Sequence, residues 1–393
     1  MTWTNVSLGD AAEIVSGATP KSSEPHNWDG EVLWATPSDL SVLREKHISR
    51  TGRTISTRGL ESCSARLLPA NSVLFSSRAP IGLVAINTKP MATNQGFKSF
   101  IPKEGLNPDY LYWWLRANKQ RLQDLGNGAT FKEVSKAVVS RVVIPLPPLD
   151  EQRRIAAILD KADAIRRKRE QALALADDLL KSTFLDMFGD PVTNPKGWPV
   201  EELGEWITHS NNGLARRRKT NANEGSIVLR LQDVRANWID YSDCNRIALD
   251  DNERDRFRLQ TGDLLFVRVN GNRDYVGRCS VFRGYREPVY HNDHLIRLKL
   301  NEKVSSDYLS FLFNLPAGRH LLSNAVKTSA GQYTVSQDGL KKLKIPLPSP
   351  PQQKSFLEFA ETLSAAREKL TRADVDAKQL FASLSQRAFR GEL

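Results

Sequence analysis

The distribution of apolar residues predicts two long amphipathic helices, one in the middle of the chain and one at its end. In the second, apolar residues recur at alternating intervals of three and four from Phe356 to Leu384. This spacing over about four heptads is typical of a coiled-coil seam. A shift of 201 residues gives the same stripe in the first helix, with a polar interruption at Arg169. The predicted helix-pairing residues are Ile155, Ile158, Ala162, Ile165 and Leu179 in the first helix, and Phe356, Phe359, Leu363, Leu370 and Leu380 in the second.

Each predicted helix follows a proline-rich lead-in, IPLPPLDEQ from Ile144 and IPLPSPPQQ from Ile345, so the two lead-ins lie 201 residues apart. Weaker matches continue upstream in the same order: LPANSVLFSSR, ending at Arg78, aligns with LQTGDLLFVR, ending at Arg268. Asn94 has a counterpart in Asn292. A period this long indicates a duplication of one plan and not a solenoid array.

The segment before each helix is predicted to be an α+β head, because short β-branched runs alternate with Gly, Asn and Pro turns. A helix of about 35 residues would be about 50 Å long, more than one compact head needs. We therefore favour mutual pairing of the helices over packing of each helix on its own head alone. The predicted fold is two α/β heads separated by a pair of long antiparallel coiled-coil helices, with an internal pseudo-two-fold duplication. The predicted segments are head one at 1–149, a helix at 150–190, head two at 191–349, and a helix at 350–393.

Charge locates the partner-binding surface on the heads. The whole chain carries a net charge of +11. Head one has 17 basic and 12 acidic residues, and head two has 24 and 18, whereas the helices at 150–190 and 350–393 carry net charges of −1 and +1. A basic membrane-binding helix would show the opposite distribution. Two basic heads suit a DNA duplex, whose phosphates supply most non-specific affinity, although an ordinary solvated surface would give the same count.

Several polar segments of the heads have the side chains that contact nucleic acid. NNGLARRRKTN in head two places four cations in a Gly- and Asn-rich loop, suited to phosphates or guanine edges. FVRVNGNRDYVGR follows a predicted strand and mixes cations with amides. The candidate DNA-binding residues are Lys21, Arg78, Gln95, Lys98 and Lys132 in head one, and Arg216, Arg217, Arg218, Lys219, Arg268, Asn270, Asn272, Arg273, Tyr275, Gln332 and Tyr333 in head two.

Two other groups of residues have a structural interpretation that we prefer. Trp113 and Trp114 could stack on bases, but the second copy has Phe311 and Leu312 there, which favours packing of a helix on its sheet. His291 and His294 in YHNDH would lie on opposite faces of a strand, which argues against a metal site.

The chain lacks the motifs of common nucleic-acid enzymes. It contains no Gly-Lys dipeptide and therefore no P-loop, and neither of its Pro-Pro sites fits the motif of an adenine methyltransferase. We expect a non-catalytic polypeptide. Three distant cysteines, no long apolar run and no signal-peptide pattern at the start favour a reducing cytosol.

These features together resemble the specificity subunit of type I restriction-modification systems. PLPPLDEQRRIAAIL, the segment GATFKEVS from Gly128 near the long predicted helix, and the terminal FRGEL carry the resemblance, which covers the whole chain. The second helix departs from the pattern with SPPQQKSF, so its local contacts are expected to differ.

The resemblance implies that each head reads one half of a bipartite double-stranded DNA target while the helices set the gap. It also implies partners: modification (methyltransferase) subunits, two of them docked on helices and heads, and restriction subunits. S-adenosylmethionine, ATP and Mg would belong to those partners, with no cofactor bound by this chain. The alternatives are a coiled-coil adaptor whose heads bind protein and, third, a stand-alone nuclease or methyltransferase.

Overall fold

The computed structural model describes residues 3–127, 132–215, 225–329 and 331–393 of the chain. It has an α+β fold, as predicted, and divides into two compact units. Unit 1 comprises residues 1–171 and 371–393, and unit 2 comprises residues 172–370. Each unit therefore takes a head and part of both long helices, which differs from the predicted division into heads and separate helices. The reason is that the helices pack into the cores of the heads.

Unit 1 is built on a five-stranded sheet and a three-stranded sheet. The order of the larger sheet is β2-β9-β6-β7-β4, and that of the smaller is β5-β3-β8. Helix α4 (Pro108–Ala117) packs on β6 and β7, and its residues from Tyr110 to Leu115 are buried. The strands are β2 (Ala12–Ser16), β3 (Trp28–Ala35), β4 (His47–Ile48), β5 (Thr54–Ile55), β6 (Val73–Phe75), β7 (Val84–Asn87), β8 (Ala92–Thr93) and β9 (Lys98–Pro102).

Unit 2 repeats this plan with a four-stranded sheet in the order β12-β21-β17-β19 and two three-stranded sheets, β16-β13-β20 and β18-β23-β22. Helix α9 (Ser306–Asn314) packs on β19 as α4 packs in unit 1. The strands are β12 (Ile207–Asn212), β13 (Ser226–Leu229), β16 (Arg246–Ile247), β17 (Leu264–Val267), β18 (Val269–Asn270), β19 (Cys279–Val281), β20 (Val289–His291), β21 (Leu295–Leu300), β22 (Val326–Ser329) and β23 (Gln332–Val335).

Short elements complete each unit. In unit 1 they are α1 (Leu8–Ala11), α2 (Pro37–Val42), α3 (Thr57–Glu61), α5 (Lys119–Asp124) and α6 (Lys136–Ser140). In unit 2 they are the paired strands β14 (Val234–Arg235) and β15 (Trp238–Ile239), and the helices α8 (Asp251–Phe257), α10 (Pro316–Ser323) and α11 (Gln337–Lys341).

The proline-rich lead-ins form equivalent strand pairs in the two units. In unit 1, β1 (Thr4–Ser7) pairs antiparallel with β10 (Val143–Leu146). In unit 2, β11 (Val200–Glu202) pairs antiparallel with β24 (Lys344–Pro346). The prolines end each strand, and a long helix begins within a few residues. The duplication inferred from the sequence is therefore also present in the backbone.

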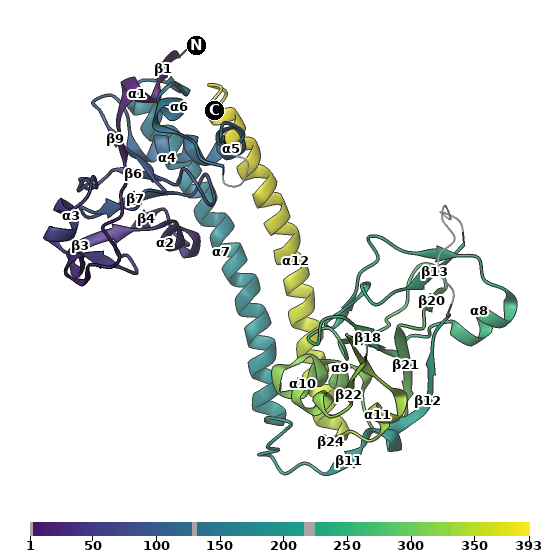
Figure 1. Cartoon of the computed structure of the whole chain (residues 1–393). Coiled ribbons are helices and arrows are strands. Elements are labelled where there is room, and N and C mark those ends of the chain that lie inside the picture. The colour runs from purple at the N-terminus through teal and green to yellow at the C-terminus, as the bar shows by residue number, and fades with distance from the viewer. Residues whose placement is uncertain (1–2, 128–131, 216–224, 330) are drawn as a thin grey trace. The chain divides into compact units, whose positions relative to one another are not determined.

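The two long helices are α7 (Leu149–Phe188) and α12 (Pro350–Ala388) (Figure 1). They run antiparallel within each unit. In unit 1, Arg154 Nη2 donates to the Leu393 carbonyl at 3.1 Å, and Glu170 pairs with Lys378 at 3.6 Å. In unit 2, Asp177 pairs with Arg367 at 2.9 Å.

Half of the predicted seam is displaced by one residue. The predicted positions that begin each heptad are buried or half-buried, whereas three of the others are exposed, at 50, 48 and 58%. The alternating spacing of three and four fits two registers that differ by one residue at these positions. Packing on the head selects the register that was not predicted: Leu159, one residue after Ile158, is fully buried, and the ring of Phe381, one residue after Leu380, lies 5.5 Å from that of Trp113. The exposed residues are Ile165, Leu179 and Leu380; Ile155 and Phe356 are buried, and Ile158, Ala162, Phe359, Leu363 and Leu370 are half-buried.

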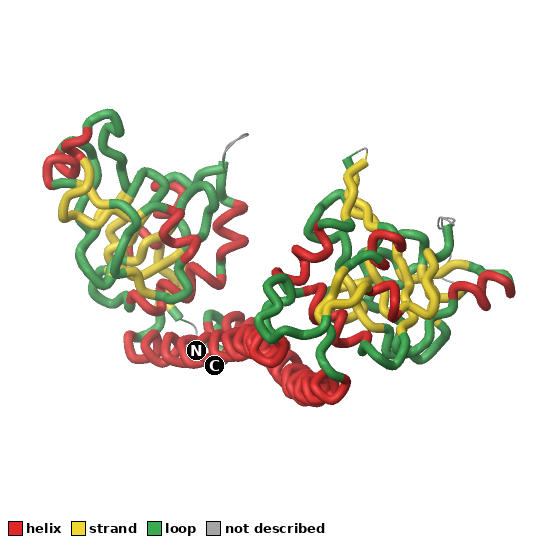
Figure 2. The backbone as a smooth tube through the Cα atoms, turned by 90° about the horizontal axis from the view of Figure 1, so that it is seen from below, coloured by secondary structure: helices red, strands yellow, loops and turns green. Residues whose placement is uncertain are grey.

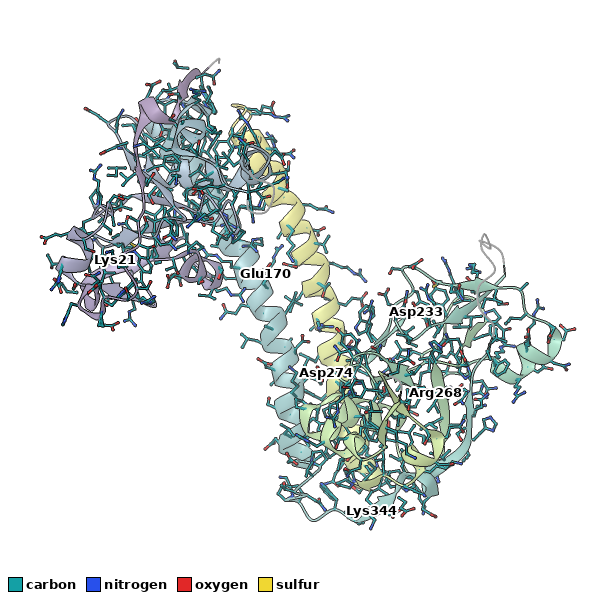
Figure 3. The ribbon with its side chains drawn as sticks, viewed as in Figure 1. Lys21, Glu170, Asp233, Arg268, Asp274 and Lys344 are labelled. Carbon is teal, nitrogen blue, oxygen red and sulfur yellow. The ribbon has the colours of Figure 1, made fainter. Side chains whose placement is uncertain are left out.

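The contact between the helices in unit 1 also has a charged part that the apolar pattern did not predict. Asp163 and Asp374 are only 5 and 6% exposed. Asp163 pairs within α7 with Arg166 at 2.7 Å, and Asp374 pairs with Lys378 at 2.8 Å, which also reaches Glu170 on α7 (Figure 3). Arg169, the polar interruption of the predicted stripe, donates to the Ala373 carbonyl of α12. The Lys378–Glu170 pair and the Arg169 hydrogen bond connect the two helices at defined positions, so they help to set the register of α12 against α7.

Candidate nucleic-acid interface

In unit 2, two candidate segments that are about 60 residues apart in the chain lie side by side. Strand β18 follows β17 directly and pairs with β23, so that Asn270 lies opposite Tyr333. Arg268, at the junction of β17 and β18, is fixed through its backbone: its N–H donates to His294 O at 2.8 Å, and its carbonyl accepts from Val335 N at 2.9 Å. Its guanidinium donates to Asp293 O at 3.1 Å.

The loop after β18 holds its polar side chains at the surface. Asn270 and Asn272 each accept a hydrogen bond from the backbone two residues ahead, at 2.8 and 2.9 Å, which fixes the turns. Tyr275 is 45% exposed, and the Arg278 guanidinium lies 4.3 Å from the centre of its ring. Arg273 is exposed. A cation stacked on an exposed aromatic ring is an arrangement on which bases can stack.

In unit 1, two of the candidate cations, Arg78 and Lys98, converge on one carboxylate. Glu133 pairs with Lys98 at 3.2 Å and with Arg78 at 3.7 Å. Lys98 is buried, so it serves the interior of the unit more readily than a partner. Lys132, next to Glu133, is exposed.

The other two candidates of head one, Gln95 and Lys21, make contacts with a segment near the start of the chain. Gln95 accepts a hydrogen bond from the Thr19 hydroxyl. Lys21 is exposed (Figure 3), and its carbonyl accepts from Trp28 Nε1 at 3.3 Å. The tetrad Arg216, Arg217, Arg218 and Lys219 lies outside the described residues, so it stays a prediction.

The structure corrects the alignment of Arg78 with Arg268. Ser77 has the backbone contacts of Arg268: its N–H donates to Gly96 O at 2.7 Å, and its carbonyl accepts from Val134 N at 2.9 Å. Arg78 therefore corresponds to the following residue, Val269. The sequence match ended on an arginine in both segments, but the first segment is one residue longer.

The sequence did not predict a charged contact that joins head one to α7. In unit 1, Lys46 Nζ lies 2.6 Å from Asp109 on α4 and 2.8 Å from Asp160 on α7. Burial alone would lower the pKa of Lys46, but hydrogen bonds to these two carboxylates outweigh it and raise the pKa. Asp160 also accepts from Trp113 Nε1 at 2.9 Å, and both Trp113 and Trp114 are buried, so their structural interpretation is confirmed.

Unit 2 has counterparts of both carboxylates, and its cation pairs with the one on the head. Asp307, the counterpart of Asp109, pairs with Arg283, and Glu361 on α12 is the counterpart of Asp160. Burial raises the pKa of Asp307, with a smaller contribution from Glu361, while Arg283 lowers it.

The buried histidine of YHNDH is a structural residue. His291 is fully buried, and its Nδ1 lies 3.1 Å from Phe257 O. Burial, assisted by the positive charge of Arg297, lowers the pKa of His291 to about 4. His294 is about half exposed. Among the described residues, no three His, Cys, Asp or Glu side chains converge into a possible metal site.

Grooves with partly equivalent linings lie between the head and α12 in unit 1 and between the head and both long helices in unit 2, and sequence reasoning did not find them. In unit 1, a groove of about 580 Å³ is lined by Trp113 and Arg116 of α4 and by Phe381 of α12. In unit 2, a groove of about 620 Å³ is lined by the counterparts of these residues, Phe311, Asn314 and Leu180. No helix in the described part of the chain has the length and apolar character needed to cross a membrane.

Comparison with known proteins gives consistent matches. The family model described as the type I restriction modification DNA specificity domain matches residues 1–175 and 195–375. The chain is 33% identical over 295 residues to the MjaIX specificity subunit of Methanocaldococcus jannaschii, covering 68% of each chain. It is 26% identical over 419 residues to the StySPI specificity subunit of Salmonella potsdam, covering 100% of this chain and 89% of that one.

Two solved structures share the fold. One, from work on complex assembly and conformational transition of the type I R-M system, has a TM-score of 0.59 at 18% identity and covers 100% of this chain and 98% of that one. The other is the S subunit of a type I restriction-modification system from M. genitalium, with a TM-score of 0.58 at 12% identity, covering 99% of this chain and 96% of that one.

Proposed function

This chain belongs to the type I restriction modification DNA specificity family, and we propose that each of its heads reads one half of a bipartite DNA target. One observation supports the assignment of one half-site to each head. The segment directly after β6 or β17 pairs with a polar segment at equivalent places in the two units. Arg78 and Glu133 form an isolated bridge in unit 1, and Val269 of β18 lies opposite Thr334 of β23 in unit 2. The same frame with different side chains suits two readers of two different sequences.

The helices α7 and α12 set the gap between the half-sites in this proposal. Each is a single helix of about 40 residues, roughly 60 Å long. Antiparallel contacts join the two helices in each unit, and the Lys46 contact couples head one to α7. A pair of continuous helices is a suitable ruler because the length of an α-helix is set by its number of residues.

The partners are modification subunits and restriction subunits in a prokaryotic cytosol. We infer that two modification subunits dock on this chain, one at each of the equivalent grooves, whose apolar walls are alike. Methyl transfer to adenine N6 after base flipping would take place in those subunits. S-adenosylmethionine, ATP and Mg belong to the partner subunits, and this chain supplies recognition without catalysis.

Binding of duplex DNA by the complex of this chain with its modification subunits tests the proposal. The logarithm of the association constant should fall linearly as the logarithm of the salt concentration rises. The quadruple change of Arg216, Arg217, Arg218 and Lys219 to Ala should weaken binding, whereas changing the exposed Lys354 to Ala on α12 should not. Salt-independent binding, or binding of protein partners with no affinity for DNA, would instead support an adaptor.

A further inference from the structure

The ribbon formed by β22 and β23 has one apolar face and one polar face. Lys327 pairs with Thr334, and Ser329 with Gln332. Partners across an antiparallel ladder share a face, and successive residues alternate. Lys327, Gln332 and Thr334 therefore lie on one face. The opposite face consists of Val326, Thr328, Tyr333 and Val335.

The apolar face anchors the ribbon. Val335 is 1% exposed in the core of unit 2, and Val326 and Tyr333 pack against that core. The third strand of this sheet, β18, pairs with β23 and is itself held by Arg268. Tyr333, a residue that the sequence proposes for DNA contact, thus faces inward, while Lys327, which the sequence did not single out, lies on the other face and is exposed.

The polar face is free to contact a ligand. Lys327 and Gln332 are exposed, and Thr334 is half-buried. A two-stranded ribbon projects from the body of unit 2 (Figure 2). The major groove of B-DNA accommodates a two-stranded ribbon, and an ammonium can donate to guanine O6 and N7 while an amide pairs with adenine N6 and N7. The cations Arg273 and Arg278 of the neighbouring loop are placed beside β18 to reach phosphates.

We propose that the polar face of the β22–β23 ribbon, formed by Lys327, Gln332 and Thr334, reads base edges in the major groove of the half-site that unit 2 recognises. This inference rests on the proposed function. The backbone of the ribbon is fixed by the core beneath it, so the side chains meet the bases from a rigid support, which specific recognition requires.

The test uses the full chain in complex with its modification subunits. Binding is measured for a library of duplexes in which every position of both half-sites is varied singly. Lys327→Ala and Gln332→Ala should each reduce discrimination at one or two positions of one half-site by roughly 5- to 150-fold. Discrimination in the other half-site should not change.

Two control variants distinguish base reading by the ribbon from a general effect of losing a surface side chain. Lys344→Ala removes an exposed cation from β24, elsewhere in unit 2 (Figure 3), and should leave every position unchanged. Gln332→Glu keeps the shape of the side chain and should shift the preference at its position from adenine towards cytosine, because a carboxylate accepts from cytosine N4.

Equal weakening on all sequences, or unchanged discrimination in both variants, would overturn the proposal for the ribbon. A wild-type complex that shows no bipartite preference would instead refute the proposed function. The wild-type measurement therefore separates the two failures.

Discussion

Gln152 and Gln353, which lie 201 residues apart, make the same three hydrogen bonds in their respective units. Gln152 accepts from Asn107 N at 2.8 Å and donates to the carbonyls of Gly105 and Pro147. Gln353 accepts from Ser305 N and donates to the carbonyls of Lys303 and Pro348. Both side chains are buried. Each ties the first turn of a long helix to its own lead-in and to the segment before α4 or α9, so the second helix keeps this contact although its sequence departs from the family pattern.

Replacing either glutamine with Ala should destabilise the unit that contains it. The change leaves buried backbone groups without partners, at a cost of roughly 1–3 kcal/mol for each group. Gln152→Ala should lower the stability of unit 1, and Gln353→Ala that of unit 2, as measured by hydrogen exchange of amides in each unit. Gln171→Ala, at an exposed position on α7, is the control and should change stability by less than about 0.5 kcal/mol. Equal effects of all three changes would contradict this account of the contact.

Lys46→Met should loosen head one from α7. The ammonium bridges Asp109 and Asp160, and its removal leaves two carboxylates facing one another. Because Asp160 is 41% exposed, solvent reduces the cost to about 1–3 kcal/mol. The raised pKa of Lys46 places the loss of this stabilisation at alkaline pH, so the contact is fully formed at pH 7. A double-mutant cycle with Asp160→Asn should show coupling, and strictly additive effects would rule out the contact.

The stability of unit 2 should fall as the pH drops from about 6.5 to about 4, because of His291. The unfolded histidine binds a proton in this range, whereas burial keeps the folded residue neutral until its pKa of about 4. The unfolded state therefore binds more protons, and each pH unit costs about 1.4 kcal/mol. In His291→Gln this part of the pH dependence should disappear from denaturant unfolding curves. An NMR titration in which His291 ionises near 6.5 would disprove the explanation.

Lengthening both helices by one heptad should widen the gap in the DNA target. Seven residues inserted after Gln171 and seven after Leu370 keep the faces of both helices in phase. The helices become about 10 Å longer, which corresponds to about three base pairs. The methylated motif should keep its two half-sites and gain that spacing. An unchanged gap would refute the ruler, and insertion into α7 alone should impair the complex because the helices no longer match.

The sequence predicted the large features of this fold because they depend on periodic patterns. The repeated lead-ins and the heptads of α7 and α12 are local signals, and the structure contains both helices. The register of the seam was only half predicted. Phe359 and Ala360 both fit an alternating spacing, and only contact with the head buries Ala360. Buried carboxylates such as Asp163 cannot be recognised from an apolar pattern, because their burial depends on cations that pair with them.

The sequence predicted which segments belong to the candidate site but not how these segments pack against one another. Pairing of Asn270 with Tyr333 joins segments that are far apart in sequence, so no local pattern shows it. For the same reason the sequence placed Tyr333 at the surface and passed over Lys327. The contact of Lys46 with Asp160 spans more than 100 residues and was equally invisible.

Mapping methylated adenines in the host genome, with and without this gene, tests the central claim most directly. The account predicts a set of modified adenines that disappears with the gene and that shares one motif, two defined half-sites separated by a gap of constant length. Exchange of head two for that of a relative should change one half-site and leave the other. A methylation pattern that does not depend on the gene, or a gene-dependent motif that forms one uninterrupted block, would contradict it.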